Sequence, residues 1–152
     1  MGRKDPVGIS GQASESYQAG FEFHATLDQL DDGLDTLHQS VQRLRETTGH
    51  RDDDRGLMLF ETALAEIGAN VLTHGRPPGA AHPVEYVLEL DENVARASFT
   101  DRGPPVHNHL AREMPGPSSE AGRGLAMARS LLDELGYERD GEMNRWRLVK
   151  RL

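Results

Sequence analysis

Hydrophobic and polar residues follow one another along this chain in two different periods. Between Phe21 and Leu27 they alternate with a period of two, which is typical of a half-buried strand. After Asp28 apolar residues recur every three or four positions, which indicates an amphipathic helix that ends near Gly49. We interpret its apolar stripe as core packing against a sheet, with a dimer interface as the alternative: Leu30, Leu34, Leu37, Val41 and Leu44.

The helical spacing returns in a second segment. The three aspartates at positions 52–54 suit a helix start, because their side chains accept hydrogen bonds from the free amides there. The helix is predicted to run to His74 and Gly75, and a proline-rich loop follows at residues 76–83. Its apolar face carries Leu57, Phe60, Leu64, Ile67 and Val71.

A β-hairpin is predicted next, followed by a long irregular stretch. Residues 84–90 and 94–99 alternate with period two, and the polar residues 91–93 between them form the turn. From Asp101 to Gly124 no period is visible, and prolines and glycines are frequent. An irregular stretch of this length inside a domain is usually either functional or disordered, and we interpret it as a lid over a site.

The remaining residues predict one more helix and two more strands. Helical spacing from Leu125 to Leu135 indicates a third helix, with Gly136 as its C-terminal cap. Two closing strands are expected around Tyr137 and at residues 145–149, joined by a turn at Asp140 and Gly141.

These elements predict an α/β fold. Three amphipathic helices would cover one face of a mixed, mostly antiparallel sheet in a two-layer sandwich. The chain has 152 residues, which suits one domain. Residues 1–20 lack apolar periodicity and are expected to be a mobile N-terminal tail, with the folded domain at residues 21–152.

Composition narrows the classes of function. There is no cysteine, which excludes disulfides, thiolate metal sites and a cysteine nucleophile. No apolar run has the length of about 18 residues that a membrane helix needs, nor is there a signal peptide, so we expect a cytoplasmic protein without a membrane. The 17 basic and 25 acidic residues give a charge of −8, which disfavours direct binding of nucleic acid.

Three segments carry candidate chemistry. Glu66, Asn70 and His74 share one stripe at the edge of the buried face of the second helix, where they serve a ligand site or merely a solvated edge. Asp101 follows a strand and can accept a hydrogen bond from a ligand amino group, although Asp-x-Gly is also a common turn. Residues 122–124, Gly-Arg-Gly, precede the third helix, where free amides favour phosphate.

In this order and spacing the three segments resemble the ATP-binding fold of DNA gyrase, the Hsp90 chaperone, bidirectional histidine kinases and MutL. The chain is most similar to the anti-sigma-factor serine kinases of bacterial partner-switching systems, over about residues 21–152. Residues 65–75 resemble the family's Glu-x-x-x-Asn-x-x-x-His-Gly helix, and residues 101–105 its Asp-x-Gly-x-Pro box. Residues 120–125 are similar to its Glu-x-Gly-x-Gly-Leu phosphate turn.

The resemblance implies a role for each matching residue. Glu66 would be the general base, and Asn70 would bind Mg²⁺ through its amide oxygen. Asp101 would accept the adenine amino group, while Gly103 leaves room for the base. The phosphates of ATP would lie against Gly122, Arg123 and Gly124, with the arginine neutralising phosphoryl charge or remaining a surface residue.

Two features fall outside that pattern. Many relatives carry a threonine in the final strand that helps to hold adenine, and residues 145–150 contain none, so adenine recognition is not explained. His107 and His109 form a His-x-His pair that we interpret as polar lid residues and not as a zinc site. His74, in contrast, matches the family's helix motif, and a structural role is favoured for it.

The resemblance implies an anti-sigma factor with serine-protein kinase activity. Its partners would be a sigma factor, which it inhibits, and an anti-anti-sigma factor with a STAS domain, which it phosphorylates with ATP and Mg²⁺. The alternatives are an ATP-binding switch module with weak or no kinase activity and a detached catalytic domain of a histidine kinase. A homodimer is left open, as are the sigma factor and the response.

Overall fold

A computed structural model of the chain describes residues 20–51, 54–74, 83–105 and 120–152. Most of the expected N-terminal tail and the middle of the expected lid, including His107 and His109, lie outside these residues. The described residues form one sheet of five strands in the order β1-β2-β3-β5-β4, and all four neighbouring pairs are antiparallel. The strands are β1 (Phe21–Leu27), β2 (Val84–Asp91), β3 (Val94–Asp101), β4 (Glu134–Asp140) and β5 (Met143–Arg151).

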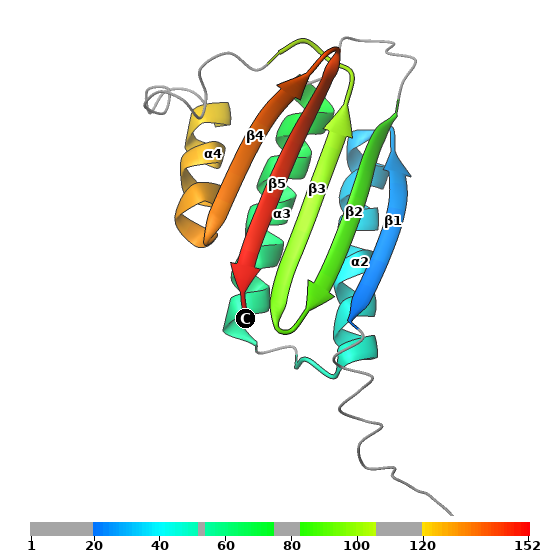
Figure 1. Ribbon diagram of the computed structural model, residues 1–152, viewed down its shortest axis with the longest axis vertical. Helices are drawn as coiled ribbons and strands as arrows, with labels where there is room; N and C mark the ends of the chain where they lie inside the picture. Colours follow the sequence, from blue (N-terminus) through cyan, green and yellow to red (C-terminus); the bar gives the residue numbers. More distant parts are fainter. Residues whose placement is uncertain (1–19, 52–53, 75–82, 106–119) are drawn as a thin grey trace, which may run out of the picture.

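Figure 1 shows that the helices of the described residues lie together on one face of this sheet. They are α2 (Leu30–Thr48), α3 (Arg55–His74) and α4 (Glu120–Leu131). Together with the sheet they confirm the predicted α/β two-layer sandwich, but the predicted mixed sheet is wrong for the described strands, whose pairs are all antiparallel. The core lies between the layers, where the predicted helical stripes meet the inward residues of the strands; its largest fully buried side chains include Phe60, Tyr86 and Phe99.

The helix ends follow local sequence signals. Gly49 adopts the left-handed conformation, with φ of 83°, and its N–H donates to the carbonyl of Arg45, which ends α2 as predicted. The Oδ1 of Asp54 accepts a hydrogen bond of 2.9 Å from the N–H of Leu57, so one of the three predicted aspartates caps the start of α3.

The third helix is displaced from its predicted limits. It begins at Glu120 and ends at Leu131, whereas Leu135 and Gly136 belong to strand β4. Leu135 pairs with Leu148 across the β4–β5 ladder, and the turn between these strands is Gly141 and Glu142, one residue later than predicted. Helical spacing at residues 131–135 is also compatible with a strand, and the pairing with β5 decides between the two.

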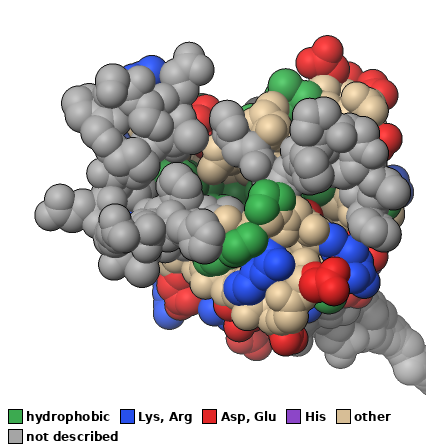
Figure 2. Space-filling model, turned by 90° about the horizontal axis from the view of Figure 1, so that it is seen from above, with side chains coloured by type: hydrophobic (Ala, Val, Ile, Leu, Met, Phe, Trp, Pro, Cys, Tyr) green, Lys and Arg blue, Asp and Glu red, His purple; other side chains and the backbone are tan. Residues whose placement is uncertain are grey.

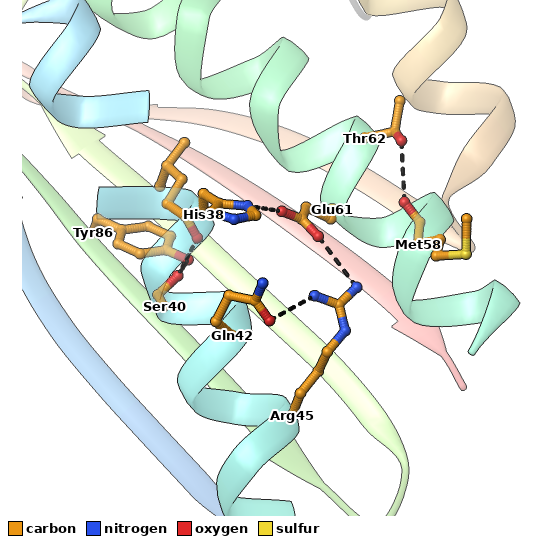
Figure 3. Close-up of polar contacts among 9 residues, drawn as sticks. His38, Ser40, Gln42, Arg45, Met58, Glu61, Thr62 and Tyr86 are labelled. Carbon is orange, nitrogen blue, oxygen red and sulfur yellow. Dashed lines mark hydrogen bonds and ion pairs between the residues drawn. The ribbon is translucent and has the colours of Figure 1, made fainter. Parts of the chain in front are cut away.

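A polar network joins α2 to α3 and to the sheet, and Figure 3 shows its members. Glu61 of α3 accepts hydrogen bonds from Arg45 at 3.3 Å and shares one with the Nδ1 of His38 at 2.7 Å. The hydroxyls of Ser40 and Tyr86 are 2.7 Å apart in the core. These contacts fix α2 against both of its neighbours.

The elements that carry the predicted site residues meet at one end of the sandwich. In Figure 1 the last turn of α3, the end of β3, the start of β5 and the start of α4 all lie at the top of the molecule. Within the described ranges, no helix combines the length and apolar character needed to cross a membrane.

Candidate active site

Glu66 and Asn70 lie one turn apart on α3, at the edge of its buried face. Both are half-buried, and each is followed in the sequence by a buried core residue, Ile67 and Val71 respectively. The core contacts of these neighbours hold the helix in place, so that the carboxylate and the amide keep a fixed spacing. The structure thus places the two predicted residues as an adjacent pair with partial access to solvent.

The start of α4 lies directly against Glu66. A Cβ atom built on Gly124 would be only 2.7 Å from the Oε1 of Glu66, so the glycine leaves the space that the carboxylate occupies. The predicted base and the predicted phosphate-binding segment, 58 residues apart in the sequence, are therefore in contact range.

Asp101 ends β3 and is almost completely buried, with 2% of its surface exposed. Its Oδ1 accepts hydrogen bonds from the N–H of Gly103 at 2.7 Å and from the Nδ2 of Asn144 at 3.0 Å. Its Oδ2 is buried and has no hydrogen-bond partner among the described residues. A buried carboxylate oxygen without a donor is costly, and a donor supplied by a ligand, such as an amino group, would satisfy it.

Asn144 is a site residue that the sequence analysis missed. It is fully buried at the start of β5, directly opposite Asp101 in the ladder. The predicted strand began one residue later, at Arg145, and therefore omitted it. The signal was present, because Asn144 continues the inward alternation of Trp146 and Leu148, and a polar residue at an inward position needs partners.

The remaining predicted site residues lie beside Asp101, on the first turns of α4 and at the end of α3. Gly103 is buried beside Asp101, and Arg123 is exposed on the first turn of α4. Gly122 also belongs to α4, whereas the sequence analysis put residues 122–124 ahead of the helix. Only the first four amides of a helix are free, so in this arrangement Gly124 is not among the free donors. α3 ends at His74, and its side chain is not described.

The residues present suit a magnesium ion that is held mainly by a nucleotide. Within the described ranges no cluster of three or more histidine, aspartate or glutamate side chains could form a cage for a metal. Mg²⁺ in phosphoryl-transfer sites is usually bound through phosphates, waters and only one or two protein oxygens. The amide oxygen of Asn70, half-buried beside Glu66, is a donor of that kind.

The described surface at this end is chemically mixed. Figure 2 looks down on it and shows hydrophobic, basic and acidic side chains close together. A ligand with an apolar ring and a charged tail would find both kinds of contact there.

Comparisons with known proteins agree with this fold. The model of the family described as histidine kinase-like ATPase domain matches residues 23–150. No curated protein matches the chain. A crystal structure of the RsbU and RsbW domains of Rv1364c from Mycobacterium tuberculosis is similar, with a TM-score of 0.63 and 22% sequence identity. The similarity covers 87% of this chain and 32% of that one, so this chain spans about a third of that protein.

Proposed function

The chain belongs to the family of histidine kinase-like ATPase domains, and from this premise we propose that it is an anti-sigma factor with serine-protein kinase activity. It binds and inhibits a sigma factor, and it uses Mg-ATP to phosphorylate a serine of an anti-anti-sigma factor with a STAS domain. These partners come from the resemblance of the motifs to anti-sigma-factor kinases. The similarity in fold to the structure with RsbU and RsbW domains suits a partner-switching system.

The proposed residues divide the reaction between them. Glu66 takes the proton from the serine hydroxyl. The serine oxygen bonds to the γ-phosphorus, and the bond from that phosphorus to the ADP oxygen breaks. Mg²⁺ neutralises charge on the phosphates when it is bound, and Asn70 is its side-chain ligand. The Oδ2 of Asp101 accepts the amino group of adenine, and Gly103 leaves room for the ring. The phosphates of ATP lie along Gly122, Arg123 and Gly124.

Glu66 and Asn70 together carry this proposal. A protein that only binds nucleotide has no need of a carboxylate one turn from the magnesium ligand. The half-burial of Glu66 and its proximity to Gly124 hold that carboxylate beside the segment proposed for the phosphates. This arrangement favours phosphoryl transfer over binding alone.

The test compares Glu66→Gln with the wild type in the presence of Mg-ATP and a STAS antagonist. Loss of a general base lowers a rate by about 100-fold or more, so we expect phosphoserine formation to fall by that much. The affinity for ATP, measured by calorimetry, should stay within about threefold of the wild-type value, because the adenine ring and the phosphates are held by other residues. Glu46→Gln is the matched control, because Glu46 is an exposed carboxylate on α2.

Other outcomes identify the alternatives. Binding of ATP by the wild type without any transfer indicates a switch module that has no kinase activity. Phosphohistidine on a partner indicates a histidine-kinase catalytic domain. Absence of nucleotide binding rejects the whole proposal.

Phosphorylation weakens the binding of the antagonist to this chain. A phosphoserine carries about −1.5 to −2 charges at neutral pH. This chain has a net charge of −8, so the modified antagonist is repelled more strongly than the unmodified one. The kinase is then released to bind its sigma factor.

A further inference from the structure

The side-chain amide of Asn144 is hydrogen-bonded through both its nitrogen and its oxygen. It is fully buried, and its amide nitrogen lies within 3.1 Å of three acceptors. These are the Oδ1 of Asp101 at 3.0 Å, the carbonyl of Gly103 at 3.1 Å and the carbonyl of Pro104 at 3.0 Å. Because all three partners are acceptors, the nitrogen and not the oxygen of the amide must face them.

The amide oxygen of Asn144 is bonded just as fully. It accepts from the Tyr137 hydroxyl and from the Nη1 of Arg139 at 3.1 Å, both on the neighbouring strand β4. The same Nη1 of Arg139 donates to the carbonyl of Gly103 at 2.7 Å. An amide with two hydrogens and two lone pairs has no capacity left for a ligand in this arrangement.

These hydrogen bonds make the two carboxylate oxygens of Asp101 different from each other. Asn144 and the N–H of Gly103 both donate to Oδ1, so that oxygen is occupied and the plane of the carboxylate is fixed. Oδ2 is buried, and no donor from the described residues reaches it. The group that completes this arrangement is a hydrogen-bond donor, such as an exocyclic amino group; a carbonyl there would bring two acceptors together.

We propose that Asn144 is a positioning residue that fixes the Asp101 carboxylate and thereby makes the site select a 6-amino purine over a 6-oxo purine. This inference rests on the proposed function, because it takes the ligand to be a purine nucleotide. It accounts for base recognition in a final strand whose residues 145–150 contain no threonine.

The experiment measures the ratio of the dissociation constants of ITP and ATP. Inosine carries a carbonyl where adenosine carries the amino group, so the ratio reports the donor at Oδ2. A ratio does not depend on the fraction of folded protein, which separates base selection from stability. For the wild type we expect ATP to bind at least about 100-fold more tightly, as in sites that hydrogen-bond a polar group of their ligand.

Asn144→Thr and Asn144→Val form a matched pair, because the two side chains have the same shape and both suit a strand. Of the two, only threonine carries a hydrogen-bond donor for the Asp101 carboxylate. We expect the ratio to fall by about tenfold or more in Asn144→Val, and by clearly less in Asn144→Thr. Equal ratios in the two variants, or a wild-type ratio in both, overturn the inference.

A second measurement uses the wild-type chain and so remains informative if the variants do not fold. The side-chain amide protons of Asn144 should exchange slowly with solvent, and their NMR signals should shift with ATP more than with ITP. Rapid exchange, or equal shifts with the two nucleotides, contradicts the inference. A wild type that binds neither nucleotide rejects the proposed function instead, and one that binds both equally rejects only the inference.

Discussion

Gly124 contributes no side chain to the site, and this is what allows Glu66 to occupy its position. The Oε1 of Glu66 lies 2.7 Å from where a Cβ would stand, and that oxygen is at the free end of a flexible side chain. A methyl group at residue 124 therefore moves the carboxylate and leaves the backbone in place. Only the side chain of Glu66 has to move, and the backbones of α3 and α4 stay in place.

We expect Gly124→Ala to separate activity from stability. A displacement of about 1 Å at a reacting group can lower a rate by about 100-fold, so phosphoryl transfer should fall by at least tenfold. Alanine is favoured over glycine in a helix by up to about 1 kcal/mol, so the melting temperature should be unchanged or higher. Single-turnover kinetics and thermal unfolding measure the two effects.

The control for this variant is Met127→Ala on the same helix, because Met127 is an exposed side chain. It should leave the transfer rate within about twofold, as is usual for surface substitutions. A Gly124→Ala variant with wild-type transfer would show that Glu66 does not need its present position.

Among the elements, α2 is attached to the rest of the molecule by buried polar contacts as well as by apolar packing. Ser40 of α2 and Tyr86 of β2 share a hydrogen bond in the core, and their hydroxyls are 2.7 Å apart. Burial is the main cause that raises the pKa of Tyr86 above its ordinary value of about 10. The phenol is therefore neutral in the folded protein at any ordinary pH.

The raised pKa of Tyr86 predicts how the free energy of unfolding depends on pH in the alkaline range. In the unfolded chain Tyr86 ionises near pH 10, whereas in the folded chain it stays protonated to a higher pH. The unfolded state then loses the proton first, so the free energy of unfolding falls above pH 10 by up to about 1.4 kcal/mol per pH unit from this group. Below pH 10 the contribution is fully present.

Tyr86→Phe isolates this contribution. At pH 8 the variant should be less stable by about 1 kcal/mol, because Ser40 loses its hydrogen bond with Tyr86 and keeps only the one to the carbonyl of Leu37. At pH 11 the difference should narrow or reverse, because phenylalanine cannot ionise. Urea unfolding at the two pH values measures both; a difference independent of pH contradicts the assignment.

At the scale of the whole molecule, the limits of the domain are still a prediction. The family model matches residues 23–150, and the first strand begins at Phe21. We expect a chain that begins at Gly20 to keep the melting temperature and ATP affinity of the full chain, because every described element remains. A clear loss of either would place part of residues 1–19 in the domain or its site.

The whole fold also explains how the candidate site is assembled. Glu66, Asp101 and Gly124 come from three elements that are far apart in the sequence, and the sandwich brings those elements to one end. The motifs were visible in the sequence because each is a local pattern. The hydrogen-bonded set around Asn144 of β5 was not, because its partners come from β3, from the two residues 103 and 104 and from β4.

The sequence by itself determined the helices α2 and α3, the presence of the strands and every candidate residue except Asn144, because periodicity and short motifs are properties of consecutive residues. Only the tertiary structure decided that Leu135 and Gly136 belong to a strand, since pairing with β5 outweighs a short helical spacing. It also decided that Asn144 faces Asp101 and that Oδ2 is left without a donor. Hydrogen bonds between strands depend on register, and register is fixed only when the whole sheet forms.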